Sequence, residues 1–217
     1  MTRDLFAAAD AHEAAVCEFA PGAWLLRGLA LPIAAALASA VQAVAAAAPF
    51  RHMVTPGGFR MSVAMTNCGV HGWVSAADGY RYTELDPGSG QPWPSLPAAL
   101  TDFAGRAAAA AGFAAFAPDA CLVNRYEPGA RLTLHQDKNE LDFGQPIVSV
   151  SLGVPAVFLF GGLKRRERPL RLEVVHGDVV VWGGPARLRY HGVAPLPQAH
   201  HPFAGNARIN LTLRHAG

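Results

Sequence analysis

The sequence predicts an α+β protein made mainly of strands, arranged as a sandwich or jelly roll. The second half is a succession of short β-branched or aromatic runs punctuated by Gly, Pro or Asp. The first half holds two alanine-rich stretches of helical length. No repeat or low-complexity linker separates the halves, so we expect residues 1–217 to form one domain.

Two helices are expected in the first half. Residues 1–31 are predicted to be irregular or in short strands. Because proline is tolerated in the first turn of a helix, Pro32 introduces a helix predicted over Ile33–Ala48. Ser95 is predicted to cap a second helix, Leu96–Ala111, before Gly112.

The segment between the helices, residues 50–94, is rich in Gly, Pro and aromatic residues. This composition predicts turns and short hairpins rather than a layer of the core. After it, seven strands at close spacing are typical of a sandwich or jelly roll. They are predicted over Cys121–Tyr126, Arg131–Gln136, Ile147–Leu152, Ala156–Phe160, Leu170–Val175, Val179–Trp182 and Arg208–Arg214.

Composition indicates a globular protein of no marked charge. The chain is 51% hydrophobic and 16% charged, and its net charge of +2 does not by itself indicate a nucleic-acid binder. Cys17, Cys68 and Cys121 are widely spaced, which predicts buried free thiols and a cytoplasmic protein. The apolar stretch Leu29–Phe50 is mostly alanine and contains a proline, so we expect a packed helix and no membrane span.

Three candidate metal ligands lie in the second half. His135 and Asp137 are two residues apart, so in a continuing strand their side chains point the same way. His191, at a predicted strand end, supplies a third ligand. Two His and one carboxylate form the facial triad that holds non-haem Fe(II) and leaves positions open for oxygen chemistry.

Other histidines compete for these roles. His176-Gly177-Asp178 repeats the His-x-Asp pattern, but it lies between two β runs with glycine at its centre and is interpreted as a hairpin turn. His200 and His201 lie in a proline-bounded loop, where solvated side chains are expected. We therefore prefer His135, Asp137 and His191.

The last predicted strand alternates between polar and apolar residues. Arg208, Asn210, Thr212 and Arg214 share one face. That face is either solvated, as in an ordinary amphipathic strand, or lines a polar pocket inside a barrel. In the second case the two arginines could reach the ends of a small dicarboxylate such as 2-oxoglutarate. The sequence thus suggests an Fe(II)- and 2-oxoglutarate-dependent oxygenase.

A basic segment, Lys164–Arg171, has five cations in eight residues. It lies between two β runs and is expected to be an exposed hairpin. It is either a solvated loop or an edge that contacts phosphates.

Several stretches in order resemble the AlkB family of nucleic-acid dealkylases, close to its bacterial founding type. The resemblance runs from Asp4-Leu5-Phe6-Ala7 to Arg214. The matching stretches are Met53–Gly58, Met61–Gly69, Pro118–Tyr126, Leu134–Lys138, Ile147–Gly153, Phe160–Arg165, His176–Gly184 and the terminal Arg208-x-Asn210-x-Thr212-x-Arg214. Such a series is specific, although any single stretch would not be.

The resemblance implies a double-stranded β-helix, or jelly roll, with supporting helices. Residues up to about 115 would form an N-terminal extension, the helices and a nucleotide-recognition lid that includes Thr55–Gly58. Residues from about 116 to 217 would form the core with its Fe(II) and 2-oxoglutarate sites. It also implies Fe(II), 2-oxoglutarate and O2 as cofactor and co-substrates.

The resemblance further assigns roles to single residues. Arg208, helped by Asn124 and Tyr126, would bind the distal carboxylate of 2-oxoglutarate, while Asn210 and Arg214 support its metal-proximal end. A second set would contact the substrate. Trp73 would stack on a flipped base held against His135, and the lid and phosphate path would be lined by Tyr80, Tyr82, Lys138 and Arg165.

Asn139 departs from the family pattern, which tends to have an acid at this position. An amide can bond the base but supplies no charge, so we expect the preference for cationic 1-methyladenine and 3-methylcytosine over neutral lesions to be weaker. Glu140 or Asp142 could compensate. Phe59 stands where the family often has Tyr, at the cost of one hydroxyl.

The expected function is therefore oxidative demethylation of N-methylated bases in single-stranded or base-flipped DNA, or in RNA, by a monomer. Formaldehyde, succinate and CO2 would be released. An oxygenase of the same fold that acts on a protein or small molecule would need neither Trp73 nor the basic segment. A binding module without turnover would not need the triad.

Overall fold

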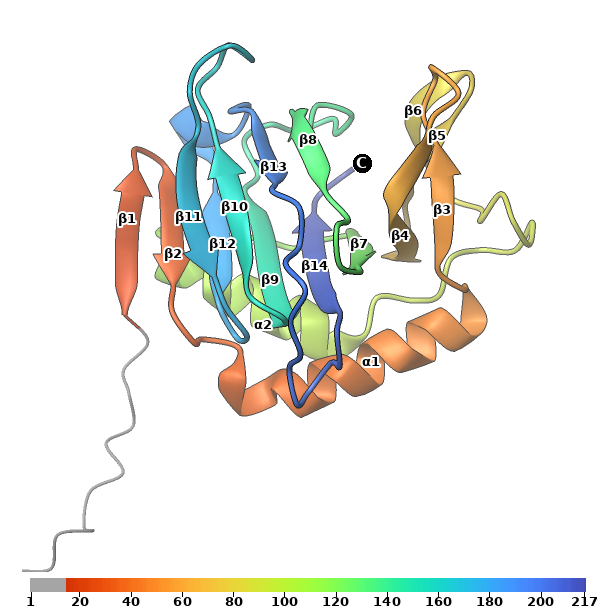
Figure 1. The fold of residues 1–217 in the computed structure, drawn as a ribbon, viewed down its shortest axis with the longest axis horizontal. Coiled ribbons are helices and arrows are strands. Elements are labelled where there is room, and N and C mark those ends of the chain that lie inside the picture. The colour runs from red at the N-terminus through yellow and green to blue at the C-terminus, as the bar shows by residue number, and fades with distance from the viewer. Residues whose placement is uncertain (1–14) are drawn as a thin grey trace, which may run out of the picture.

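The computed structural model describes residues 15–217, which form two facing antiparallel sheets and two main helices (Figure 1). The predicted match at Asp4–Ala7 lies outside the described residues. The main sheet has eight strands in the order β1 (Val16–Ala20), β2 (Ala23–Leu26), β12 (Val179–Trp182), β9 (Ile147–Gly153), β14 (Arg208–Arg214), β7 (Ala120–Tyr126), β4 (Arg60–Gly69) and β3 (Arg51–Val54).

The second sheet faces the main one and closes the jelly roll. Its four strands are β11 (Leu170–Val174), β10 (Ala156–Phe160), β13 (His191–Val193) and β8 (Leu132–His135). Between the sheets, Phe158, Phe160 and Trp182 pack with ring centroids 5.8 to 6.4 Å apart. The jelly roll predicted from the sequence is confirmed.

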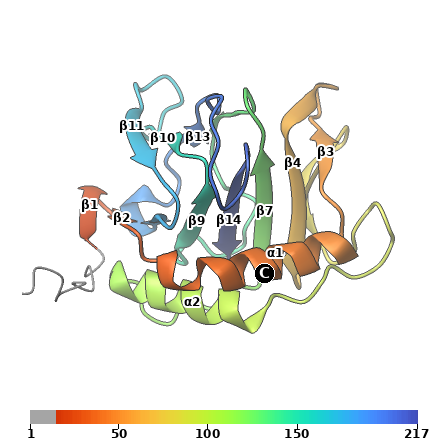
Figure 2. The ribbon, with the colours of Figure 1, turned by 60° about the horizontal axis from the view of Figure 1, so that its bottom comes forward.

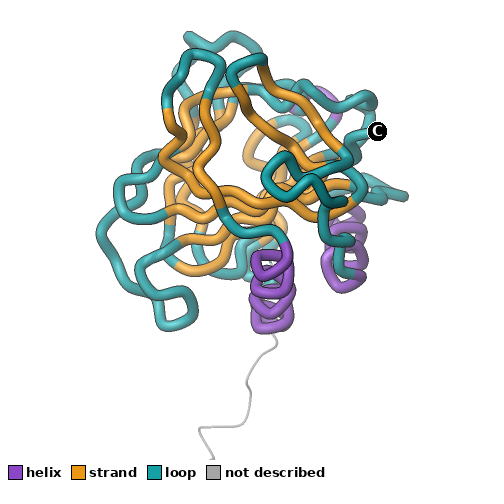
Figure 3. Tube along the Cα trace, turned by 90° about the vertical axis from the view of Figure 1, so that its right-hand side faces the viewer, coloured by secondary structure: helices purple, strands orange, loops and turns teal. Residues whose placement is uncertain are grey.

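The outer face of the main sheet is covered by the helices. α1 (Ala34–Ala47) follows the 3₁₀ turn η1 (Leu31–Ile33), and α2 (Ala98–Ala110) lies beside α1 across the strands (Figure 2). Seen from the side, both main helices lie on one side of the strands (Figure 3). Their apolar residues form a second core with the outward side chains of the main sheet. No helix in the described part of the chain is both long and apolar enough to cross a membrane.

The helix boundaries follow proline and glycine chemistry. Pro32 occupies the first turn of η1, as expected. Ser95 does not cap α2: the N-cap position is Pro97, and no side chain bonds there. Because proline disfavours helical geometry in the residue before it, Leu96 cannot begin the helix. Gly112, at a φ of +85°, ends it as predicted.

Residues 50–94 correct the sequence prediction. β4 is a ten-residue strand of the main sheet, and its Val63 and Met65 are buried in the core. The Gly- and Pro-rich flanks hid this strand, which has few β-branched residues. The hairpin of β5 (Gly72–Ala76) and β6 (Gly79–Thr83) does match the expectation.

Two smaller predictions are also corrected. His176-Gly177-Asp178 is a turn, but it joins β11 to β12, which belong to different sheets, so it is not a hairpin. Cys68 and Cys121 are buried free thiols as predicted, whereas Cys17 is exposed because β1 is an edge strand.

Candidate metal and co-substrate site

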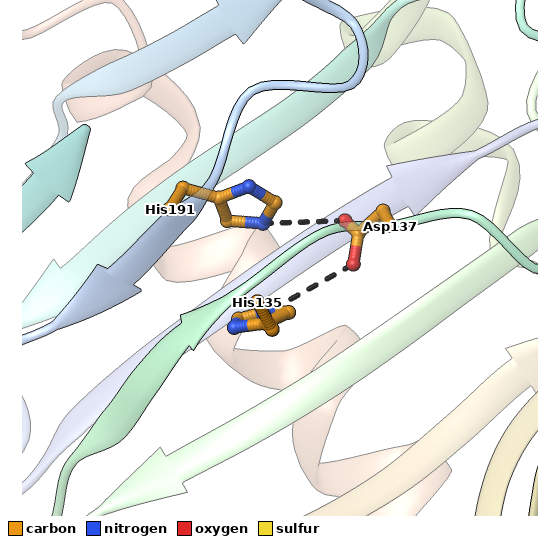
Figure 4. Close-up of side chains that lie close together, drawn as sticks. All are labelled: His135, Asp137 and His191. Carbon is orange, nitrogen blue, oxygen red and sulfur yellow. Dashed lines mark ion pairs between the residues drawn. The ribbon is translucent and has the colours of Figure 1, made fainter. Parts of the chain in front are cut away.

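Three predicted ligand side chains converge inside the jelly roll (Figure 4). His191, the first residue of β13, lies directly opposite His135, the last residue of β8, and Asp137 follows two residues later. Nε2 of His135 is 3.7 Å from Asp137 Oδ1, and Nε2 of His191 is 3.5 Å from Oδ2. The predicted convergence is confirmed, although β8 ends before Asp137.

Both imidazole rings are oriented by backbone carbonyl groups. The Nδ1 atom of His135 lies 2.9 Å from the Thr133 carbonyl oxygen, and that of His191 lies 3.1 Å from the Arg189 carbonyl oxygen. A proton on each Nδ1 would donate to these oxygens and leave the Nε2 lone pair facing Asp137.

The electrostatics favour the unprotonated forms of Asp137 and His135. Burial raises the pKa of Asp137, but Arg214 and the two histidines outweigh it and hold that pKa well below its usual range. Desolvation, together with His191, lowers the pKa of His135 to about 4, even though 37% of its side chain is exposed. Metal binding requires deprotonated ligands, so this donor set fits a divalent cation such as Fe(II).

The polar face of β14 points inward and is buried, so the solvated interpretation of this strand is wrong. Asn210 donates to Ser149 Oγ at 2.8 Å and to the Val150 carbonyl at 3.0 Å, and it accepts from Thr212 at 3.0 Å. Asn124 Nδ2 donates to Asn210 Oδ1 at 3.3 Å. The side chains around this strand are thus held in place before any ligand binds.

The two arginines of β14 differ sharply. Arg214 donates to Asp137 Oδ2 from Nε at 3.0 Å and from Nη2 at 2.7 Å, so its charge is already paired with Asp137. Arg208 is buried at 2% exposure and donates from Nη2 to Ser151 at 3.0 Å, but its Nε and Nη1 atoms have no partner.

An unpaired buried cation is costly, so the surroundings of Arg208 fit an anionic ligand. Burial lowers the pKa of Arg208, and its guanidinium lies 5.0 Å from the centre of the Tyr126 ring. Burial likewise raises the pKa of Tyr126 to about 12, which keeps its hydroxyl protonated. A carboxylate fits here, since charge-assisted hydrogen bonds from a guanidinium to a carboxylate are short and strong.

The hairpin β5–β6 carries the predicted base-stacking residues. The Trp73 and Tyr80 rings stack with centroids 5.5 Å apart and planes at 13°. Trp73 Nε1 donates to Asn139 Oδ1 at 3.3 Å, which joins the hairpin to the loop after β8. Trp73 and Asn139, predicted as substrate-binding, are therefore brought together.

The remaining predicted substrate residues are more scattered. Tyr82 turns inward, and its hydroxyl donates to Glu140 at 2.6 Å. Lys138 is exposed beside Asp137, and Arg165 is exposed in the loop that joins β10 and β11. Thr55–Gly58 forms the turn between β3 and β4, with Gly58 at a φ of +80°.

The competing histidines have other partners. His201 packs against His176 with ring centroids 4.6 Å apart, and His200 Nδ1 lies 3.0 Å from Asn206 Oδ1. Asp178 pairs with Arg27 at 2.6 Å and accepts from the backbone of Gly28. These residues therefore stabilise turns, while His135, Asp137 and His191 form the metal-binding geometry.

Sequence reasoning missed Arg187 and the structural role of Glu140. Arg187, directly after the 3₁₀ turn η2 (Gly184–Ala186), is buried and donates to the Asp137 carbonyl at 2.8 Å. Glu140 pairs with Arg187 at 3.1 Å. The sequence around Arg187 carries no motif that signals this position.

Comparisons with known proteins agree with this geometry. Residues 22–214 match the model of the 2OG-Fe(II) oxygenase superfamily. The chain is 53% identical to the alpha-ketoglutarate-dependent dioxygenase AlkB of Escherichia coli strain K12, covering 99% of this chain and 98% of that one. It is 36% identical over 122 residues to the mouse nucleic acid dioxygenase ALKBH1, covering 56% of this chain and 31% of that protein. The solved structure of OsALKBH1 superposes with a TM-score of 0.81 at 27% identity, covering 93% of this chain and 100% of that one.

Proposed function

Because the chain belongs to the AlkB family of 2-oxoglutarate- and Fe(II)-dependent dioxygenases, we propose that it repairs alkylated nucleic acid by oxidative demethylation. The substrates are N-methylated bases of the 1-methyladenine and 3-methylcytosine type. One observation carries the proposal: the metal-binding geometry and the unpartnered cation of Arg208 share one buried interior. The mouse relative is named for its action on nucleic acid.

His135, Asp137 and His191 hold Fe(II) in this proposal. When bound with 2-oxoglutarate and O2, the metal supplies the oxidising chemistry: 2-oxoglutarate is decarboxylated to succinate and CO2, and the N-methyl carbon is hydroxylated. The hydroxymethyl group then leaves as formaldehyde and restores the base.

The protein orients the co-substrate and keeps water out. Arg208 binds the distal carboxylate of 2-oxoglutarate through its free guanidinium N–H groups, with Tyr126 and Asn124 beside it. The unpartnered Oδ1 of Asn124 is an acceptor, so it takes a hydrogen bond from water rather than from a carboxylate. Asn210 and Arg214 shape the metal-proximal end.

The nucleic acid is bound through the hairpin β5–β6. A target atom on the Watson–Crick edge is reachable only in a flipped or single-stranded base, and in this proposal Trp73 stacks on that base. Tyr80 extends the stack, and Asn139 bonds the edge of the base. Lys138 and Arg165 line the phosphate path, with single-stranded DNA as the main substrate and duplex DNA or RNA as others. The protein works as a cytoplasmic monomer.

The test is anaerobic loading with Fe(II) and 2-oxoglutarate, then air, with a single-stranded oligonucleotide containing 3-methylcytosine. We expect its mass to fall by the difference between a methyl group and a hydrogen, and His135→Ala to abolish this loss. Succinate without demethylation would redirect the search to protein or small-molecule substrates. If folded, metal-loaded protein forms neither succinate nor demethylated oligonucleotide, the proposal is refuted.

A further inference from the structure

A cluster of four buried charges lies behind the metal-binding geometry. It consists of the carboxylates of Asp137 and Glu140 and the guanidiniums of Arg187 and Arg214, whose side chains are at most 9% exposed. Removing charges from water is costly and is offset only where each charge is paired, so the arrangement of partners fixes this cluster.

Arg187 holds the loop that carries both carboxylates. Its Nη1 donates to the Asp137 carbonyl at 2.8 Å, its Nε donates to the Gln145 carbonyl at 3.0 Å, and its Nη2 lies 3.1 Å from Glu140 Oε2. One side chain therefore fixes the backbone of the candidate ligand Asp137 and the charge of Glu140 together.

Arg214 is shared between the two carboxylates. It donates twice to Asp137 Oδ2, and its Nε lies 3.5 Å from Glu140 Oε1. A stronger attraction to Glu140 would therefore weaken its hold on Asp137.

Tyr82 connects this cluster to the hairpin that carries Trp73. Its hydroxyl, on β6, donates to Glu140 Oε1 at 2.6 Å, on the oxygen that faces Arg214. Trp73 lies opposite Tyr82 in the register of β5 and β6. A movement of the hairpin that broke this hydrogen bond would leave Oε1 with Arg214 as its nearest cation.

We propose that Glu140 is a positioning residue that couples the hairpin β5–β6 to the metal ligand Asp137. With Tyr82 bonded, Oε1 of Glu140 has a hydrogen-bond donor and Arg214 stays on Asp137. If Tyr82 moves away, Oε1 of Glu140 attracts Arg214 more strongly. The hydrogen bonds from Arg214 to Asp137 then weaken. This inference rests on the proposed function, in which Asp137 binds the metal and the hairpin binds nucleic acid.

Coupling is reciprocal, so nucleic acid that keeps Tyr82 bonded to Glu140 must also change the affinity of the protein for the metal. The test titrates metal-free protein with Co(II), with and without a single-stranded oligonucleotide, and follows the visible spectrum of the bound ion. In the unaltered protein we expect the oligonucleotide to tighten Co(II) binding by about tenfold, within the usual range of such couplings.

Tyr82→Phe removes one hydroxyl and is expected to fold. We expect it to bind Co(II) and the oligonucleotide separately but to lose most of the coupling, and Glu140→Gln to do the same. Glu140→Gln also leaves Arg187 without an anion, so its thermal melt is measured beside it. Thr83→Val is the matched control, because the Thr83 hydroxyl donates to the Gly72 carbonyl and accepts from Trp93 rather than contacting Glu140, so its loss should leave the coupling intact.

The outcomes separate the two ideas. A protein that binds neither Co(II) nor the oligonucleotide contradicts the proposed function itself. If it binds both without coupling, or if Tyr82→Phe keeps the full coupling, the role of Glu140 is refuted.

Discussion

The interior face of β14 and the hairpin β5–β6 both serve the proposed reaction, but they satisfy their polar groups in opposite ways. On β14, Arg208, Asn210 and Arg214 are buried, and protein partners occupy most of their polar atoms. On the hairpin, Tyr80 is 46% exposed, and Trp73 is joined to the loop after β8 by one hydrogen bond, to Asn139.

This difference separates chemistry from selectivity. Buried charged groups tolerate few arrangements, because each lost partner leaves an unpaired charge in a dry site. Exposed aromatic groups can adjust to different bases, since stacking depends little on base identity. We therefore expect substitutions on β14 to affect every substrate alike, and substitutions at the hairpin to change substrate binding alone.

Arg208→Met tests the interior side of this comparison and has the largest expected effect. Hydrogen bonds to charged groups are worth about 1.5–3 kcal/mol each. Losing two of them should raise the KM for 2-oxoglutarate by about 100-fold or more. The melting temperature without 2-oxoglutarate should not fall, because methionine replaces an incompletely paired buried cation.

The readouts are succinate formation over a range of 2-oxoglutarate concentrations and a thermal melt of each variant. Arg125→Met, which removes an exposed arginine from neighbouring β7, should leave both unchanged. A marked loss of stability in Arg208→Met, with an unaltered KM, would mean that Arg208 serves the fold rather than the co-substrate.

Trp73→Ala tests the other side of the comparison. Base stacking on an aromatic side chain is worth about 1–3 kcal/mol, so the KM for a methylated oligonucleotide should rise by about tenfold. Substrate-independent succinate formation should stay the same, because the hydrogen bonds of Trp73 go to Asn67 and Asn139 and not to the polar residues of β14. Leu85→Ala, an exposed apolar side chain just beyond the hairpin, is the control. An equal rise in the KM for 2-oxoglutarate would show that the two regions are not separable.

The same division explains what the sequence could predict. Strand alternation alone places Arg208, Asn210 and Arg214 on one face, and two-residue spacing aligns His135 with Asp137. The sequence near β8 does not tell which strand will pair with it. That His191 lies opposite His135 is therefore seen only in the folded sheet.

Residues whose role depends on distant partners were the ones missed. Arg187 acts on Asp137, 50 positions earlier in the chain, and no local pattern announces that contact. Tyr82 was expected along the substrate path, yet its hydroxyl reaches inward to Glu140, 58 positions later. β4 was missed for a local reason: its Gly- and Pro-rich flanks outweighed its own modest strand propensity.

Asn139→Asp has the smallest expected effect and sharpens the comparison most, because it adds charge at the point where hairpin and loop meet. An aspartate can still accept the hydrogen bond from Trp73, although it loses the long donation from Asn139 Nδ2 to the Tyr80 carbonyl. At about 4 Å, one charge attracts a cationic base by about 1 kcal/mol in water, or roughly fivefold. We expect activity on cationic 3-methylcytosine to rise by that factor relative to neutral 3-methylthymine.

Salt dependence identifies the cause of such a shift. Asn139 is exposed, so an electrostatic preference should shrink as ionic strength rises, whereas a preference set by shape should not. The ratio of the two demethylation rates at low and high salt is the measurement, with the KM for 2-oxoglutarate as the internal check. If the ratio is the same in both proteins, the amide at position 139 does not set lesion preference. Glu140 cannot supply the charge that Asn139 lacks, because it is buried and paired with Arg187.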